Sequence, residues 1–402
     1  MKVLIYFEKE QLAPTGGPAG YLYNINKELE KNNISEVEFL NTKSNNRRKK
    51  ILRILNKIPK PINQIIINYK KKYWARVINN IFYGKKYCTS MDLNKYDIIH
   101  FHSTLAMYNI KDSLKEYKGK IVLTSHSPKA YHLEILDNTP QEIKSKYIDE
   151  IKNIDIIDEY AFNRADYIHF PVPEAEECYY NTWSKYENIH KKNKDKYIYI
   201  PTGINSVTIN TSKEEYRKKY NIPKDAFVIS YVGRHNEIKG YAQLKEIGKK
   251  VLKIDSNLYF LIGGKEEPLK GIKDKNWIEV GWTNKPHDLI NASDLFILPN
   301  KETYFDLIML EVLSSGKTIL ATNTGGNKYF KKLKSKGIYY YDYGDIDTAI
   351  KLIKNIKKTN LKELEKNNKK IFNENFTIDI FVKSYLDMMK KIAKKDSEKN
   401  EI

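Results

Sequence analysis

The chain has 402 residues, of which 41% are hydrophobic and 12% aromatic, and its formal net charge is +20 at pH 7. This length suits two domains, and the hydrophobic content is sufficient for globular cores. No stretch approaches the roughly 18 apolar residues that a membrane-spanning helix needs, which argues against an integral membrane protein.

The cysteines and the first residues indicate the compartment. Cys88 and Cys178 are too few for a disulfide framework, as is typical of a reducing environment. The apolar run at residues 1–7 is too short for a signal peptide, and charged residues follow it. We therefore expect a cytoplasmic protein, which can still dock on the inner face of a bacterial membrane.

The positive charge is compatible with three polyanionic partners, namely nucleic acid, anionic lipid and nucleotide diphosphates. Heavy use of Lys, Asn, Ile and Tyr is typical of an AT-rich genome, and this bias explains much of the charge. The lysines are spread along the chain, and no nucleic-acid-binding motif accompanies them. We therefore expect no nucleic-acid partner.

Short apolar runs alternate with helical patterns in the first half, which is the rhythm of β-α-β units. The predicted strands are residues 3–7, 36–40, 96–103, 120–127, 165–172 and 196–203, and helical spacing occurs at 18–33, 104–118 and 141–164. The loop after the first strand contains Gly16 and Gly17, where the absence of Cβ lets the backbone approach donor phosphates or an acceptor. A plain turn is the alternative for this loop.

Residues 47–76 form the densest basic segment of the chain. Apolar residues between positions 51 and 58 fall on one helical face, with arginines and lysines around it. A basic amphipathic helix can lie on anionic lipid, which would suit a lipid-linked acceptor. The alternative is a solvated helix that packs on its own domain.

The second half repeats the pattern. Its predicted strands are residues 227–233, 257–264, 277–282, 294–300 and 317–323, and its helices are 240–254, 286–293 and 306–315. The expected division is a first domain at 1–203, a second at 204–376, a helix at 377–394 that crosses back to the first, and a frayed tail at 395–402. Two facing parallel-sheet domains would place ligands at the carboxyl ends of the strands.

The most informative stretch is residues 299–327, where a strand leads into a polar loop and an amphipathic helix. The N-terminus of a helix offers unpaired N–H groups to a phosphate, and Glu311, one turn further along, can accept hydrogen bonds from a ribose. Arg234 and Lys239 follow the strand at 227–233. Two cations and a helix N-terminus together predict a nucleoside diphosphate site.

Motifs along the chain support this prediction. They are, in order, GGPAGY, DIIHFHS, VLTSHSP, RADYIHFP, IPTGIN, VGRHNEIKG, LIGG, WIEVGW, ASDLFILPN, DLIMLEVLSSGK and TNTGGN. This series resembles glycosyltransferase family 4 over most of the chain. The resemblance implies an α/β chain with the GT-B fold, in which two Rossmann-like, doubly wound parallel-sheet domains face each other across a cleft.

The resemblance also implies a reaction, the transfer of a sugar from a nucleotide-sugar with retention of anomeric configuration and without a bound metal. The departing phosphate oxygen then takes the proton of the acceptor hydroxyl, so no protein base is needed. His126 matches a family histidine that positions the sugar. His100 and His102 alternate onto one strand face near it, but no acidic residue is spaced to complete a metal site.

The leaving diphosphate must meet positive charge that is already in place. Nothing in the sequence resembles a carboxylate cage for a metal, so we expect Arg234, Lys239 and the loop backbone to supply that charge. The loop residues assigned to the donor are Thr303, Tyr304, Phe305, Asp306 and Leu307, the last three through their N–H groups.

One departure from the family pattern concerns the first of two paired acids. Thr303 stands where that acid is expected, Glu302 is one position early, and Asp306 occupies a common glycine position. Either Thr303 replaces the acid, with Asp306 adding a carboxylate nearby, or a bulge lets Glu302 reach the sugar. We favour Thr303.

These observations predict a metal-independent retaining glycosyltransferase of the hexosyltransferase type. The expected donor is a UDP-sugar, and the expected acceptor is a hydroxyl of a glycan or lipid-linked molecule in bacterial surface polysaccharide synthesis. Two alternatives remain open: a catalytically weak partner subunit that binds nucleotide-sugar, and transfer to a protein acceptor.

Overall fold

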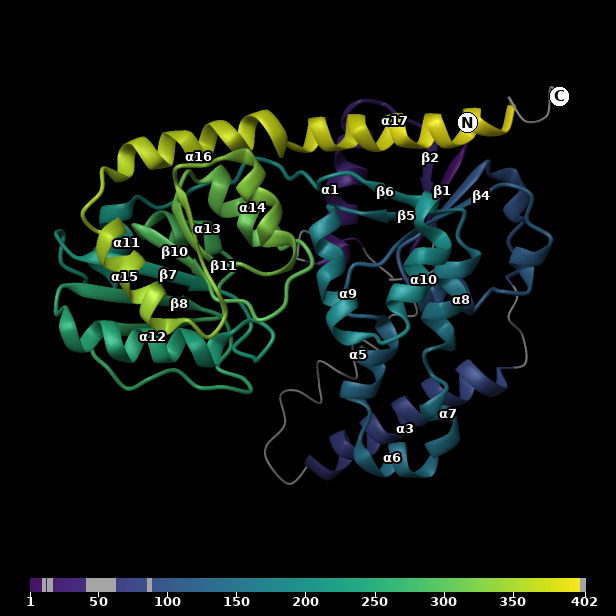
Figure 1. Ribbon diagram of the computed structural model, residues 1–402, viewed down its shortest axis with the longest axis horizontal. Coiled ribbons are helices and arrows are strands. Elements are labelled where there is room, and N and C mark those ends of the chain that lie inside the picture. The colour runs from purple at the N-terminus through teal and green to yellow at the C-terminus, as the bar shows by residue number, and fades with distance from the viewer. Residues whose placement is uncertain (9–11, 13–16, 41–62, 85–88, 398–402) are drawn as a thin grey trace. The chain divides into compact units, whose positions relative to one another are not determined.

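The computed structural model describes residues 1–8, 12, 17–40, 63–84 and 89–397 (Figure 1). Gly16, Cys88 and residues 47–62 of the predicted basic segment 47–76 lie outside the described residues. The chain forms two compact units. One holds Met1–Phe170, Tyr179–Ile198 and Tyr385–Ile402, and the other holds Pro171–Cys178 and Tyr199–Ser384.

The first unit contains a six-stranded sheet in the order β2-β1-β3-β4-β5-β6. Its strands are β1 (Val3–Tyr6), β2 (Val37–Phe39), β3 (Ile98–Phe101), β4 (Lys120–Thr124), β5 (Tyr167–Phe170) and β6 (Tyr197–Tyr199). β1 pairs in parallel with β2 and β3, and β4 pairs in parallel with β3 and β5. Side chains on both faces of β1 and β3 are buried, as in a parallel sheet covered by helices on both sides.

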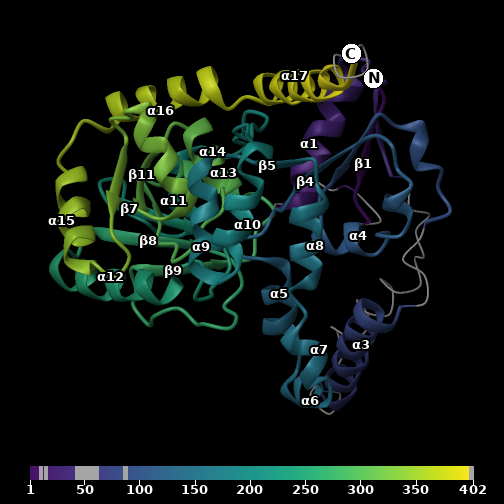
Figure 2. The same ribbon diagram turned by 45° about the vertical axis from the view of Figure 1, so that its right-hand side comes forward.

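The first unit also contains helices. They are α1 (Pro18–Lys31), α3 (Asn63–Tyr83), α4 (Thr104–Tyr108), α5 (Tyr131–Asn138), α6 (Gln141–Lys146), α7 (Ile148–Lys152), α8 (Ile156–Arg164) and α10 (Tyr186–Asn193), with 3-10 turns η2 (Leu93–Lys95), η3 (Ser113–Lys115) and η5 (Lys194–Lys196). The turn η4 (Pro173–Glu176) belongs to the second unit, and α9 (Glu177–Thr182) has residues in both. Figure 2 shows α3 beside α6 and α7. None of the helices in the described ranges is both long and apolar enough to cross a bilayer.

Two helix predictions in this unit were wrong in extent. Residues 104–118 form α4 and η3 instead of one helix, and residues 141–164 form three helices. The helix predicted at 141–164 is first interrupted at Tyr147, whose φ of −118° and ψ of 45° are not helical. Apolar periodicity continued across this break because the successive short helices bury side chains on the same core, as Ile143 and Ile157 do.

The second unit contains a six-stranded sheet in the order β12-β11-β10-β7-β8-β9. Its strands are β7 (Phe227–Val232), β8 (Leu258–Gly263), β9 (Trp277–Gly281), β10 (Leu295–Leu298), β11 (Thr318–Thr322) and β12 (Ile338–Tyr341), and its pairs are parallel. The eleven predicted strands of the chain are all present, although each is shorter than predicted, and the doubly wound α/β class is confirmed. The sequence analysis missed β12.

Helices cover both faces of this sheet. They are α11 (Lys213–Lys219), α12 (Tyr241–Ile254), α13 (Pro286–Asn291), α14 (Leu307–Ser314), α15 (Ile346–Ile356) and α16 (Leu361–Asn375), together with the 3-10 turn η6 (Gly325–Leu333). α12 and α15 pack on one core with Trp277, whereas α11 and α13 pack on another with Val228. The last helix, α17 (Ile378–Ser397), has residues in both units, since the first unit resumes at Tyr385.

An aspartate just before a strand ties neighbouring strands together in both units. Asp166 Oδ2 accepts a hydrogen bond of 2.8 Å from the N–H of Ile121, at the start of β4. Asp294 Oδ2 accepts one of 2.8 Å from the N–H of Val228, at the start of β7. These carboxylates complete the backbone hydrogen bonding at the amino ends of the strands, opposite the edge where ligands bind in such sheets.

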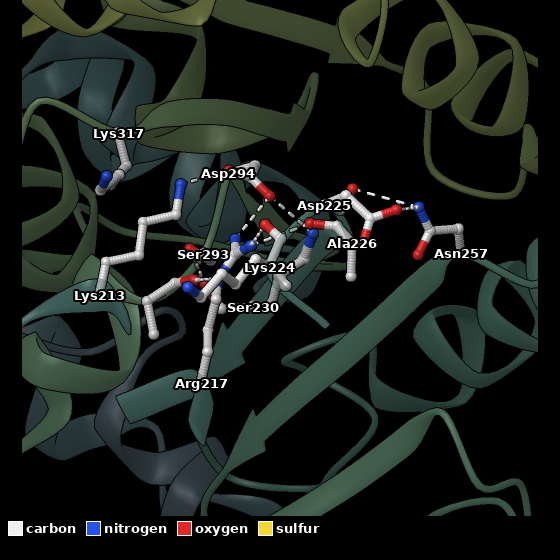
Figure 3. Close-up of polar contacts among 12 residues, drawn as sticks. Lys213, Arg217, Lys224, Asp225, Ala226, Ser230, Asn257, Ser293, Asp294 and Lys317 are labelled. Carbon is white, nitrogen blue, oxygen red and sulfur yellow. Dashed lines mark hydrogen bonds and ion pairs between the residues drawn. The ribbon is translucent and has the colours of Figure 1, made fainter. Parts of the chain in front are cut away.

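Asp294 is also the centre of a buried ion pair, shown in Figure 3. Arg217 Nη2 lies 2.7 Å from Asp294 Oδ2, and Lys213 Nζ lies 2.5 Å from Oδ1. The same guanidinium donates to the carbonyl oxygens of Ala292 and Ala226 at 2.8 and 2.9 Å. A guanidinium with this many partners meets the condition under which a buried charge is tolerated, so the cluster holds α11 to the amino ends of β7 and β10.

Candidate functional site

Two loops at the carboxyl ends of β7 and β10 form the frame of the candidate site. The N–H groups of Lys301 and Glu302 donate to the carbonyl oxygen of Ile238, at 2.9 and 3.4 Å. Gly240 has a φ of +65°, and a Cβ there would lie 1.6 Å from the carbonyl oxygen of Pro299. Glycine is therefore required at 240, because both its backbone conformation and this close approach exclude a side chain.

This frame brings Lys239 to Asp306. Lys239 Nζ lies 2.6 Å from Asp306 Oδ2, and Asn300 Nδ2 donates to the same oxygen at 2.6 Å. Burial raises the pKa of Asp306, but the Lys239 charge and hydrogen bonds from Lys239, Asn300 and Thr303 outweigh it and hold the pKa below its usual value. The carboxylate is therefore ionised at neutral pH and balances part of the Lys239 charge.

Arg234 follows β7 and is exposed. Its carbonyl oxygen accepts a hydrogen bond of 2.8 Å from the Tyr231 hydroxyl. Burial raises the pKa of that phenol, with the Asp306 charge raising it further and the Arg234 charge lowering it, so both charged groups act on the same phenol. Within the described residues the Arg234 guanidinium has no hydrogen-bond or ion-pair partner, and it is free to meet an anion.

The helix α14 begins next to these cations. Asp306 is its N-cap residue, but the Asp306 side chain makes no capping hydrogen bond. In the described part of the chain, the backbone N–H groups of Phe305, Asp306 and Leu307 have no recorded acceptor. The positive end of this helix is thus available to an anion, as a diphosphate site requires.

Glu311 lies one turn into α14 and is half-buried. Its Oε2 is 3.2 Å from Nε2 of His287, in the first turn of α13. The sequence analysis did not single out His287, because nothing in the local pattern relates α13 to α14. The ribose role of Glu311 stays a prediction.

The loop before α14 is built from buried side chains. Thr303 is 1% exposed, and its Oγ1 accepts a hydrogen bond of 3.2 Å from Asn300 Nδ2. Its carbonyl oxygen accepts from the N–H of Gly326 at 3.2 Å, and a Cβ on Gly325 would come within 2.0 Å of that oxygen. The turn at Gly325 and Gly326 therefore packs closely against the backbone of this loop. Whether Thr303 or Glu302 replaces the missing acid stays a prediction.

The aromatic rings of this loop are buried, and the donor-binding role of Tyr304 stays a prediction. Phe305 is 7% exposed and stacks on Phe330 with ring centroids 5.5 Å apart, and Tyr304 is 8% exposed. Phe305 therefore contributes its backbone N–H to the candidate site and uses its ring to anchor the loop. Asn300 is fully buried and donates hydrogen bonds to both Thr303 and Asp306, so it is also part of the candidate site. The sequence analysis missed Asn300, although its place directly after a buried strand was a usable signal.

The remaining predicted residues lie in the first unit. His126 Nε2 is 2.7 Å from Nδ1 of His102, and the Tyr21 ring meets the His126 ring edge-on at 4.8 Å. Gly17 precedes α1 with a φ of +76°, a conformation that favours glycine. The His100 and His102 rings are in contact, with centroids 4.0 Å apart and planes tilted by 40°. Among the described residues, no group of three His, Cys, Asp or Glu side chains could hold a metal ion.

Comparison with known proteins connects this geometry to a family. Residues 212–373, which include both loops and α14, match the family of glycosyl transferases group 1. The chain is 28% identical over 169 residues to UDP-Gal:alpha-D-GlcNAc-diphosphoundecaprenol alpha-1,3-galactosyltransferase of Escherichia coli. It is 27% identical over 150 residues to lipopolysaccharide 1,2-N-acetylglucosaminetransferase of Salmonella typhimurium.

These curated matches are partial. The first covers 38% of this chain and 42% of its relative, and the second covers 33% and 39%. The fold likeness extends further. The solved structure of Anabaena HepE in complex with UDP and glucose matches with a TM-score of 0.62 at 13% identity, over 97% of this chain and 99% of that one. The two six-stranded sheets with their helices are thus those of the GT-B glycosyltransferase fold.

Proposed function

We propose that the protein is a retaining glycosyltransferase of family 4. It transfers a sugar from a nucleotide-sugar to a hydroxyl of a glycan or lipid-linked acceptor in bacterial surface polysaccharide synthesis. The observation that carries this proposal is the pairing of Lys239 with Asp306 beside Arg234 and the unpaired N–H groups that begin α14. The match of residues 212–373 to group 1 glycosyl transferases supports the same conclusion.

The chemistry follows from the charges at this end of the sheet. When the glycosidic bond to the diphosphate breaks, negative charge grows on the phosphate oxygen next to the sugar. In this proposal the Arg234 guanidinium, the Lys239 ammonium and the N–H groups of residues 305–307 stabilise that charge. We propose that they do so without a metal ion, while the leaving oxygen takes the proton of the acceptor hydroxyl.

The donor and acceptor classes rest on the named relatives. The galactosyltransferase is named for UDP-Gal and for an acceptor carried on diphosphoundecaprenol, and HepE was solved with UDP. We propose a UDP-sugar donor and a polyprenol-linked or glycan acceptor for this chain. Glu311, one turn into α14, would hold the ribose hydroxyls.

A donor screen tests this proposal. The purified chain is titrated calorimetrically with UDP, GDP and ADP, and then with the sugar nucleotides of the base that binds. Turnover is measured with and without EDTA, and the anomeric configuration of the product is assigned by NMR. The proposal expects UDP to bind most tightly, the configuration to be retained and EDTA to have no effect. Inversion or loss of activity in EDTA would contradict the mechanism, and absence of nucleotide binding would contradict the function.

We further propose that α3 contributes to peripheral docking on anionic membrane. Residues 63–83 contain no acidic side chain, and Lys70, Lys72, Tyr73 and Arg76 are exposed on this helix. Basic and aromatic side chains together suit an anionic lipid surface. Co-sedimentation with vesicles that contain anionic lipid, at low salt, tests this. A chain that stays in the supernatant while a lipid-binding standard pellets would remove the proposal.

One observation favours a second candidate, a catalytically weak subunit that binds nucleotide-sugar. Asp306 already balances part of the Lys239 charge, and a threonine stands at the expected acid position. Less positive charge would then remain to stabilise the leaving group. Nucleotide binding without hydrolysis or transfer to lipid-linked, glycan and protein acceptors would support this candidate over the enzyme.

A further inference from the structure

Asp306 stands at an N-cap position but does not act as an N-cap. An aspartate there normally accepts a hydrogen bond from the N–H of the second or third helical residue. The Asp306 side chain makes no such bond, and its Oδ2 instead accepts from Lys239 Nζ and Asn300 Nδ2, both at 2.6 Å. The carboxylate is thus turned away from the helix axis, toward the loop that precedes α14.

This orientation is fixed from more than one side. Lys239 belongs to the loop after β7, Asn300 to the loop after β10, and the two loops are themselves hydrogen-bonded through Ile238. The Thr303 side chain also stabilises the charged carboxylate, which keeps the Asp306 pKa low. An ionised group held by residues of two loops is preorganised, because its position does not depend on one flexible side chain.

The contacts with Lys239 and Asn300 leave part of the hydrogen-bonding capacity of the Asp306 carboxylate unused. A carboxylate has about four acceptor sites, and the hydrogen bonds from Lys239 and Asn300 both reach a single oxygen, Oδ2. Asn300 is fully buried, and within the described parts of the chain its Oδ1 has no hydrogen-bond partner, although its amide nitrogen donates to Asp306 and Thr303. The second oxygen of Asp306, Oδ1, therefore remains as an acceptor beside the unpaired N–H groups of residues 305–307. A ligand suited to both must combine an anion with hydroxyl groups.

We propose that Asp306 determines donor-sugar specificity: its carboxylate, held in place by Lys239 and Asn300, accepts hydrogen bonds from the hydroxyls of the donor hexose. This inference rests on the proposed function. In this arrangement Lys239 contacts both Asp306 and the diphosphate, because its ammonium has three hydrogen-bond donors and can bridge them. The carboxylate thereby supplies the acceptor that Thr303, a neutral residue, cannot supply in charged form.

The test separates the sugar from the nucleotide. Asp306→Asn and Asp306→Ala are compared with the unaltered chain for the dissociation constants of UDP and of the preferred UDP-sugar, and for kcat and KM. Glu237→Gln is the matched control, since it also removes a carboxylate that pairs with a lysine, Lys301, but lies exposed at the tip of the first loop. Thermal unfolding of each variant checks that the fold is kept.

The expected result is a selective loss. Hydrogen bonds to a charged group predict about 10- to 100-fold weaker binding of the UDP-sugar in Asp306→Ala, with UDP itself bound equally well or more tightly. Asp306→Glu, which retains the charge on a longer arm, should recover part of the loss or change the preferred sugar. Glu237→Gln should bind both ligands as the unaltered chain does.

Other outcomes would overturn the inference. If UDP and UDP-sugar both bind more tightly to Asp306→Ala by the same factor, Asp306 only repels the diphosphate. If both weaken equally, its role is to hold the loop. If the unaltered chain binds no nucleotide, both the proposed function and the inference fail. If the unaltered chain binds UDP but the Asp306 variants bind UDP-sugar as well as it does, only the inference fails.

Discussion

Lys239 Nζ and Asp306 Oδ2 lie 2.6 Å apart, although the two residues are separated by 67 positions in the sequence. Lys239 ends the loop after β7, and Asp306 begins α14, so the ion pair joins the two segments that the sequence analysis assigned to a diphosphate. Asp306 balances part of the Lys239 charge, whereas the Arg234 guanidinium has no hydrogen-bond or ion-pair partner among the described residues.

The first prediction concerns Arg234. We expect Arg234→Ala to weaken UDP binding by about 10- to 100-fold, since a hydrogen-bonded charge contributes roughly 1.5–3 kcal/mol. Arg234→Lys should recover only part of this, because an ammonium cannot reproduce the planar, two-pronged contact of a guanidinium with a phosphate. Calorimetric titration measures both. The control is Lys301→Ala, which removes an exposed cation from the neighbouring loop; an equal loss there would mean that only overall charge matters.

The second prediction concerns the approach of the two loops. We expect Gly240→Ala to lower the free energy of unfolding by at least about 1–3 kcal/mol, because the strained backbone conformation costs that much and the new Cβ also meets the Pro299 carbonyl. Gly344→Ala is a matched control, since Gly344 has a φ of +93° but nothing within 4 Å of its Cβ position. Urea unfolding compares the two. Equal losses would show that the close approach adds nothing to the backbone strain.

The third prediction concerns the buried Arg217–Asp294 pair in Figure 3. We expect Arg217→Met to destabilise the second unit by about 3–5 kcal/mol, because the carboxylate of Asp294 would lose its guanidinium partner inside the protein. Chemical denaturation measures the loss. Lys250→Met breaks an exposed pair with Asp347 and should cause almost no change. A small loss for Arg217→Met would indicate that Lys213 alone satisfies Asp294.

The fourth prediction concerns the pH dependence of stability. Burial raises the pKa of Asp294, but Lys213, Arg217 and the N–H of Val228 outweigh it and hold the pKa below 3.8. The folded state thus favours the ionised carboxylate, so its contribution to stability is complete above pH 3.8 and is lost as the pH falls below that value.

Asp294→Asn removes this titration. We therefore expect the variant to be less stable than the unaltered chain at neutral pH, and the difference between them to narrow as the solution is acidified below pH 3.8. Urea unfolding at a series of pH values measures the difference. Asp347→Asn, at an exposed position, is the control. A gap between the two proteins that stays constant with pH would contradict the assignment.

The sequence predicted the elements better than their extents. The eleven predicted strands all exist, because short and mostly apolar runs between polar loops leave few alternatives in a parallel sheet. β12 was missed because its Tyr339 and Tyr340 are only half-buried at the edge of the sheet, so the apolar signal was weak. The break at Tyr147 was missed because burial on one core continues the helical pattern across it.

Individual residues of the candidate site could be predicted from the sequence, but the contacts between them could not. Arg234, Lys239 and α14 were recognisable from a strand, a loop and a helix start, which are local patterns. Asn300 was missed, and its bond to Asp306 could not be predicted, because the turn between β10 and α14 decides which side chains meet. His102 illustrates the same limit in the first unit. Its strand position was predictable, but its contact with His126 depends on the register of β3 and β4.

The amino-acid sequence by itself determined the two α/β units, the loops after the strands and the residue types that suit a diphosphate. These follow from apolar periodicity and from the short-range chemistry of glycine, helix starts and charge. The packing of the loops is needed to know that Lys239 pairs with Asp306, that the Arg234 guanidinium has no partner among the described residues, and that α14 begins without a side-chain cap. The reason is that a charged side chain binds the best partner within a few ångströms, and distance in space is set by how distant loops pack.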